Sequence, residues 1–254
     1  MVQAINKQEA NIMNGLMLHC GGEPSTREGL DAFKAPDKTD TYSPIAHLDL
    51  TNRVLQISQD LLKGYTLDRE SYGVAREGNQ LFALLTFKNG NEEMGLSIGY
   101  RNSYDKSMSV GFAEGNSVFV CDNLMLKGDI TYMRKHTGNV WGEVEDRLIS
   151  ICYEATKHYE EIAVYADTLK AIELDNKKAF SIMGNLYGEG IISPRQLTIV
   201  KEQWLKPDYP DFQPRTAWSF YNANTEALKS SPPSSVMENH VNLSKYFNDN
   251  VIDI

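Results

Sequence analysis

The feature that most constrains the fold of this sequence is one long helical period in its second half. Apolar residues recur there every three or four positions over many turns, which places them on one face of a helix. They are Val144, Leu148, Ile151, Ala155, Tyr159, Ile162, Ala166 and Leu169. This pattern predicts one long amphipathic helix that packs its apolar face on a sheet.

The sheet is predicted from the residues before this helix, where short runs of β-branched, aromatic and aliphatic residues alternate with turn signals. Glycine-bearing turns at residues 77–79, 89–91 and 114–116 favour antiparallel hairpins between neighbouring runs. The candidate strands are 72–76, 80–87, 95–101, 107–113 and 117–121. We therefore expect an α+β fold with an antiparallel meander of four to five strands.

Four further helices are indicated by capping residues and apolar spacing. Ser43 and Pro44 are typical of a helix start, and Gly64 of its end, so residues 44–63 are expected to be helical. A capping box at Ser193–Gln196 predicts a helix that runs to about Leu205. Residues 177–187 and 218–229 complete a helical C-terminal half.

The chain is long enough for one domain with a sizeable core. Residues 1–40 are polar and rich in glycine and proline, which favours a loosely ordered arm. Residues 41–229 hold the predicted elements and form a single α+β domain. A double proline within 230–235 indicates a linker, and residues 230–254 are expected to form a linker and tail.

Composition limits the classes of function. The formal net charge is −9 at pH 7, so the molecule as a whole repels polyanions, and nucleic-acid binding needs a local basic patch. No apolar run is long enough to cross a bilayer and residues 1–8 contain no secretory apolar segment, so we expect no membrane association and a cytoplasmic location. The three cysteines, Cys20, Cys121 and Cys152, favour buried reduced thiols.

Metal and cofactor chemistry find little support in the sequence. The five histidines are scattered and form no HxH or HExxH pattern, and no phosphate-binding or dinucleotide-binding glycine motif is present. We therefore expect no metal and no cofactor.

The densest polar cluster lies between two predicted strands. Its amide, hydroxyl, carboxylate and ammonium groups could grip a ligand, but the same residue types are also those that satisfy the backbone of a hairpin turn. Both interpretations stay open. The cluster consists of Arg101, Asn102, Ser103, Tyr104, Asp105, Lys106 and Ser107.

A second polar cluster follows the last predicted strand. In an antiparallel meander it could meet the first cluster at one rim of the sheet. Its members are Cys121, Asp122, Asn123, Lys127, Arg134, Lys135 and His136. A cysteine near a histidine permits a nucleophile–base pair, whereas the surroundings of Cys121 in a strand favour a small buried side chain.

These clusters also carry a family resemblance. The ordered segments are 42–47 (YSPIAH), 102–107 (NSYDKS), 120–123 (VCDN), 134–137 (RKHT), 190–197, and Trp218 with Asn222, Ala223 and Thr225. From about residue 42 to 229 the chain resembles the phage/plasmid-like family known as domain of unknown function 932. The resemblance implies a protein encoded by a phage, prophage or plasmid, and attaches no activity to any residue.

Three functions are compatible with the sequence. The leading hypothesis is an accessory protein in DNA transactions that binds or anneals single-stranded DNA, with a homo-oligomer such as a ring as an option. Its contacts would be Arg101, Lys106, Lys127, Arg134 and Lys135. A sheet followed by a long helix is similar in outline to single-strand annealing proteins, which is an analogy of fold alone.

The alternative is a module that binds and regulates a host protein, for which an acidic surface is natural. The third hypothesis is an enzyme of undefined reaction class that uses Asp105, Cys121, Asp122 and His136.

Overall fold

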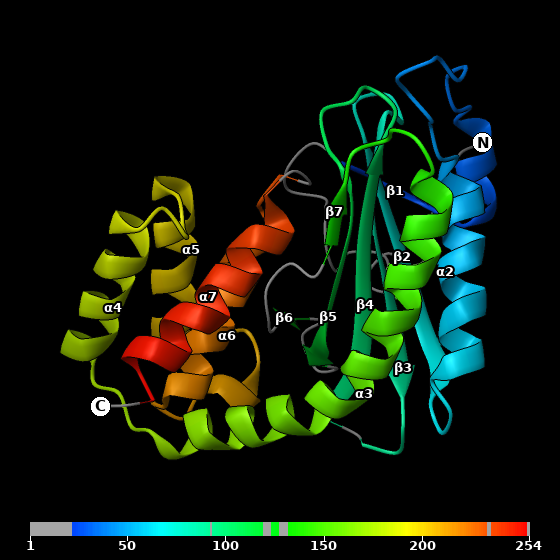
Figure 1. The fold of residues 1–254 in the computed structure, drawn as a ribbon. Coiled ribbons are helices and arrows are strands. Elements are labelled where there is room, and N and C mark those ends of the chain that lie inside the picture. Colours follow the sequence, from blue (N-terminus) through cyan, green and yellow to red (C-terminus); the bar gives the residue numbers. More distant parts are fainter. Residues whose placement is uncertain (1–21, 92, 119–122, 127–131, 233–234, 253–254) are drawn as a thin grey trace, which may run out of the picture.

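The computed structural model describes residues 22–91, 93–118, 123–126, 132–232 and 235–252. Its centre is a seven-stranded antiparallel sheet in the order β1-β2-β3-β4-β5-β6, with β7 also paired to β5 (Figure 1). The strands are β1 (Glu23–Ser25), β2 (Thr66–Ala75), β3 (Gln80–Lys88), β4 (Met94–Ser103), β5 (Val110–Val118), β6 (Asn123–Leu126) and β7 (Tyr132–Arg134). The expected antiparallel meander is confirmed.

Two of the predicted turns lie where the sequence indicated. Ala75 pairs with Gln80 across the turn between β2 and β3, and Asn79 N donates to Arg76 O at 3.0 Å. Between β3 and β4, the Asn91 side chain accepts hydrogen bonds from the backbone of Glu93 and Met94. Asparagine thus satisfies turn backbone here, as its residue type favours.

The third predicted turn is wrong, because residues 114–116 lie inside β5. Gly115 pairs with Ser97 of β4 and with Leu126 of β6. The Asn116 Nδ2 donates to Tyr159 O at 3.4 Å, and Glu114 contacts His158. The polar residues that suggested a turn are therefore buried against the long helix, which tertiary contact alone makes favourable.

Two helices cover one face of the sheet, α2 (His47–Leu61) and the first part of α3 (Val140–Ala171) (Figure 1). The predicted apolar face of α3 is buried along its whole length. Cys152 lies on that face as a free buried thiol, and burial raises its pKa to about 11. The prediction of a buried reduced thiol is confirmed for Cys152, whereas Cys20 and Cys121 lie outside the described residues.

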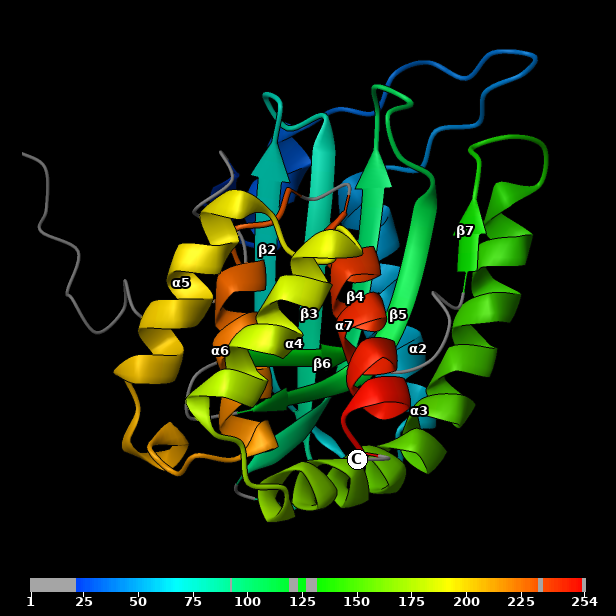
Figure 2. The ribbon, with the colours of Figure 1, turned by 90° about the vertical axis from the view of Figure 1, so that its left-hand side faces the viewer.

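The remaining helices form a second core around the far end of α3 (Figures 1 and 2). They are α4 (Asn176–Gly188), α5 (Pro194–Leu205), α6 (Ala217–Leu228) and α7 (Val236–Asn250), with short 3₁₀ helices η1 (Glu28–Ala32) and η2 (Pro210–Phe212). The capping box is confirmed, since Ser193 Oγ accepts from Gln196 N and Gln196 Oε1 accepts from Ser193 N at 2.8 Å. Every helix of the described part is too short or too polar to cross a lipid bilayer.

Helix α2 begins three residues later than predicted. Its first residue is His47, and Ala46 before it is extended. The preceding segment is held by distant partners, because Ser43 N donates to His136 O at 2.8 Å and His47 N donates to the Tyr104 hydroxyl at 2.7 Å. These contacts override the local helix-start signal of Ser43 and Pro44.

Both ends of the described chain are more ordered than predicted. At the start, β1 pairs with β2 and Leu30 is fully buried, although residues 1–21 lie outside the described residues. At the end, the expected tail contains α7, whose Val236 and Met237 pack on Phe82 and Leu84 of the sheet. The apolar spacing of α7 provides the buried face that a tail would lack.

Candidate functional site: a polar rim at one end of the sheet

Several loops meet at one end of the sheet, and we call this surface the rim (Figures 1 and 2). It comprises residues 33–47, the turn at 76–79, residues 102–109 at the end of β4 and in the turn after it, and the segment at 135–139. Tyr104 N donates to Asn79 O at 2.7 Å, which ties the two hairpin turns together. The rim therefore holds most of the first polar cluster and the end of the second.

A buried amide connects the two clusters. Asn102 Nδ2 donates to Ile45 O at 2.7 Å and lies 3.0 Å from His47 Nδ1. Asn102 Oδ1 lies 2.6 Å from His136 Nε2. These three polar side chains are almost fully buried. Asn102 thus joins β4, the start of α2 and the segment after β7.

The protons of this network follow from the acceptors. The Gly78 carbonyl oxygen can only accept, so His47 Nε2, 3.0 Å away, carries a proton and donates it. His47 Nδ1 is then the acceptor for Asn102 Nδ2. Because both amide protons of Asn102 are engaged, its Oδ1 faces His136, whose Nε2 must be the donor.

Both imidazoles are held neutral. Burial lowers the pKa of His47 to about 4, against a smaller opposite effect of the Gly78 carbonyl and with a further lowering by His136. Burial also lowers the pKa of His136. At neutral pH the network is therefore uncharged, and its role is to fix the geometry of the rim.

Two tyrosines surround the network. The Tyr104 ring stacks on His47 with centroids 3.9 Å apart, and its hydroxyl donates to Phe33 O at 3.2 Å. The Tyr42 hydroxyl donates to Tyr104 O at 3.1 Å. The rim loops are thus anchored through aromatic side chains with satisfied polar ends.

Charged side chains stand above this anchored layer. Lys106 Nζ lies 4.6 Å from the centroid of the Tyr42 ring, and the Lys135 side chain is exposed. Arg76 Nη1 donates to Asp105 Oδ2 at 3.2 Å. Partial burial opposes ionisation of Asp105, but the hydrogen bonds of Ser107 and Arg76 prevail and hold its pKa below the usual range.

The tips of both hairpins have an unusual backbone. Arg76, Glu77 and Lys106 adopt positive φ angles of 50°, 57° and 61°. Among the described residues these are the non-glycine positions in the left-handed region. Each costs roughly 1–2 kcal/mol relative to the ordinary helical conformation, and such positions cluster at functional sites.

Other members of the first cluster have local structural roles. Ser103 Oγ donates to Met108 O at 2.8 Å, and Ser107 Oγ contacts Asp105 and accepts from Gln80 Nε2 at 2.6 Å. Arg101 faces away from the network, because alternate residues of β4 point to opposite sides of the sheet. Its guanidinium is buried and donates to both carboxylate oxygens of Glu238 in α7.

The second cluster is divided by the structure. Lys135 and His136 belong to the rim, and Arg134 ends β7 opposite Val110. Asn123 pairs with Val118, eight residues along β5 and therefore roughly 27 Å away at about 3.4 Å per residue. Cys121, Asp122 and Lys127 lie outside the described residues, so a pair of Cys121 with His136 stays a prediction.

Residues outside both clusters complete the rim. His47 and Tyr42 are central to it, and the signal for them was the 42–47 segment of the family resemblance. Arg76 carried no signal, because a residue in a turn becomes a neighbour of Asp105 only through strand pairing. Within the described residues, no group of three histidine, cysteine or acidic side chains is placed to hold a metal ion.

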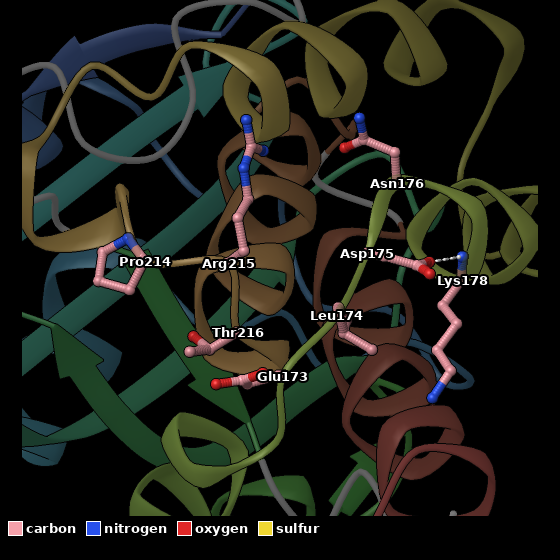
Figure 3. A pocket seen from close by; sticks show the side chains of 8 residues that line it. All are labelled: Glu173, Leu174, Asp175, Asn176, Lys178, Pro214, Arg215 and Thr216. Atoms are coloured by element: carbon pink, nitrogen blue, oxygen red, sulfur yellow. Dashed lines mark hydrogen bonds between the residues drawn. The ribbon is translucent and has the colours of Figure 1, made fainter.

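A depression of about 700 Å³ lies elsewhere, between the start of α4 and residues 214–216 (Figure 3). Two charged side chains that line it form hydrogen bonds with the backbone at helix ends. Asp175 accepts from Lys178 N at 2.7 Å at the start of α4, and the Arg215 guanidinium donates to Trp204 O and Leu205 O at the end of α5. Figure 3 shows Arg215 and Lys178 extending in opposite directions. The depression therefore lacks a convergent set of ligand-binding groups.

Comparison with known proteins gives one match. The family model described as a domain of unknown function (DUF932) matches residues 39–245, which include most of the rim, helices α4, α5 and α6, and the greater part of α7. No curated protein and no solved structure matches the chain.

Proposed function

Because this chain belongs to the DUF932 family, a family without an assigned activity, we propose a function from the rim itself: it binds single-stranded DNA there. In the phage and plasmid context that the resemblance implies, the protein would be an accessory factor in DNA transactions. The contacts would be made by the rim cations Arg76, Lys106 and Lys135.

The observation that carries this proposal is the backbone of the two hairpin tips. Arg76 and Lys106 occupy left-handed positions that glycine or asparagine would fill at lower cost. A cationic side chain kept at such a position is best explained by a use for its charge. Lys106 is also fixed over the Tyr42 ring, which orders its ammonium at the surface.

The DNA contact would be made to phosphates more than to bases. The rings of Tyr42 and Tyr104 are mostly buried and support the loops, so they offer little surface for base stacking. The carboxylate of Asp105 neutralises part of the Arg76 charge. A modest affinity with little sequence preference is therefore expected.

The direct test is fluorescence anisotropy of a labelled single-stranded oligonucleotide at several salt concentrations. Three phosphate contacts predict that log K falls with log salt with a slope of about −2, so the affinity should fall roughly fifteenfold between 50 and 200 mM salt. Arg76→Gly and Lys106→Gly should each weaken binding at least about threefold and reduce the slope. Both glycine variants should fold normally, since glycine suits a positive φ.

The matched control is Glu77→Gly, at the left-handed position beside Arg76. It relieves the same backbone strain without removing a cation, so it should stabilise the fold by about 1 kcal/mol and leave DNA binding intact or stronger. Absent or salt-insensitive binding by the parent protein would contradict the proposal.

A protein partner is the second candidate, and the net charge of −9 favours it. An acidic protein can occupy a nucleic-acid site on its target through electrostatic complementarity. If the oligonucleotide does not bind, the same rim variants should instead weaken co-purification with a host protein, and unchanged co-purification would count against this alternative.

A further inference from the structure

Helix α4 presents an aromatic face to solvent. It lies at the side of the molecule away from the sheet (Figure 1). Ala179, Ile182 and Leu186 are buried toward the second core. Phe180 and Tyr187, seven residues apart and so on one side of the helix, are 36% and 48% exposed. Two large apolar side chains exposed on one face of a helix are typical of a surface that binds a partner.

The residue between the two rings has no side chain. A Cβ added at Gly184 would meet nothing within 4 Å, so the packing of the chain itself does not require glycine there. Glycine inside a helix costs roughly 0.5–1 kcal/mol relative to alanine. Its benefit is a flat strip between Phe180 and Tyr187 that the backbone of another helix can approach closely.

The charges of α4 oppose its own dipole. Asp175 caps the helix, but the first turn carries Lys177 and Lys178 and no acid, and the helix ends on Glu189 with no base in the last turn. Cations are unfavourable near a helix N-terminus and anions near a C-terminus. An antiparallel second copy of α4 would place each charged end beside an opposite one.

We propose that α4 is a homodimer interface in which two copies of the helix pack antiparallel about a two-fold axis near Gly184. This arrangement sets Phe180 of one subunit against Tyr187 of the partner subunit, because the two positions are symmetric about Met183 and Gly184. A two-fold contact of this kind uses the same surface of both subunits. It lies apart from the rim, so it extends the proposed function without depending on it.

The size of this surface sets its expected strength. Thirteen residues of helix span about 20 Å at 1.5 Å per residue, so the contact lies below the standard buried area of about 1,200–2,000 Å². A dimer with a dissociation constant in the micromolar range is therefore expected. Self-association should be visible at about 100 µM protein and lost on dilution.

Sedimentation equilibrium on the full chain tests the proposal. The parent protein should reach twice its chain mass of 28.6 kDa at high concentration. Gly184→Leu should raise the dissociation constant at least about tenfold, because its side chain separates the helices, while the melting temperature of the monomer does not fall. Lys201→Leu on the exposed side of α5 is the control and should leave the dimer unchanged.

A charge swap tests the antiparallel geometry. Lys177→Glu with Lys178→Glu should dissociate the dimer, and adding Glu189→Lys should restore it. A single-chain mass at all concentrations would overturn the proposal, as would a dimer that Gly184→Leu leaves intact. The DNA-binding measurement at the rim is separate, so failure of either proposal can be recognised by itself.

Discussion

At the scale of single residues, the Asn102 amide is the centre of the rim. Its two protons and its oxygen reach Ile45 O, His47 and His136. A buried polar group that loses its partner costs roughly 1–3 kcal/mol. Loss of the Asn102 amide would therefore lower stability mainly because its buried partners would be left without hydrogen bonds.

The corresponding prediction concerns Asn102→Ala. It leaves buried donors and acceptors without partners, so the free energy of unfolding should fall by about 3 kcal/mol or more in urea denaturation. Asn52→Ala on the exposed side of α2 is the matched control and should change stability by no more than about 0.5 kcal/mol. Similar losses for the two variants would contradict the network.

His47 gives a prediction about pH. Its pKa is about 4 in the folded state and about 6.5 when unfolded, so the unfolded chain binds the additional proton. The contribution of neutral His47 to the free energy of unfolding is complete above about pH 6.5. It decreases as the pH falls toward 4, by about 3 kcal/mol in total.

Imidazole NMR measures this group directly. The His47 ring should stay neutral at pH 5.5, with its proton on Nε2. Direct observation matters because Glu114 acts in the opposite sense: burial raises its pKa, although His158 opposes the shift, so its contribution decreases as the pH rises. A His47 ring that titrates near 6.5 in the folded protein would show that it is not buried.

At the scale of elements, β4 and α7 are joined by an ion pair that the sequence did not indicate. Only 3% of the Arg101 side chain is exposed, and its Nη1 lies 2.8 Å from Glu238 Oε1. The sequence suggested Arg101 as a DNA contact, but the side chain is committed to α7. Its partner is 137 residues away, beyond any local pattern.

Removing the acid of this pair should loosen the start of α7. Glu238→Gln leaves a buried guanidinium without its counter-charge, which costs roughly 3–5 kcal/mol. Hydrogen exchange of α7 amides should accelerate. Glu145→Gln breaks the half-exposed pair with Arg53 and should cost at most about 1 kcal/mol. Equal effects of the two variants would show that burial adds nothing to the Arg101 pair.

Elements with a continuous apolar period were the ones predicted best. Helices α4, α5 and α6 lie within about one residue of their predicted bounds, and α3 contains the whole predicted apolar stripe, because each has a local stripe or cap. Strand β5 was divided wrongly at Gly115, where three turn-forming residues outweighed the strand pattern. Local signals could not show that Glu114 and Asn116 face α3.

At the scale of the whole molecule, two hydrophobic cores share α3. One lies between the sheet and α2, and the other lies among the C-terminal helices. Helix α7 contacts the outer face of the sheet through Met237 and the second core through Phe247. Helix α7 therefore links the sheet to the second core.

Truncation tests this role. A chain that ends at Ser230 loses α7 and exposes Phe82, Leu84 and part of the second core. We expect it to bind a hydrophobic dye and to unfold with a markedly lower midpoint or to aggregate, because several buried side chains each contribute roughly 2–5 kcal/mol. An unchanged, cooperative melting curve would show that residues 231–254 are a dispensable tail.

The sequence alone determined the α+β class, the antiparallel meander and the long helix, because each depends on a periodicity among near neighbours. The tertiary structure alone decided the rim: Asn102 is 55 residues from His47 and 34 residues from His136, and the three meet only when β4, α2 and the segment after β7 are assembled. It also decided that Arg101 is buried and that α7 is packed. Hydrogen bonds and ion pairs between distant segments produce no periodic pattern in the sequence, because the residues that form them are brought together only when the apolar faces pack.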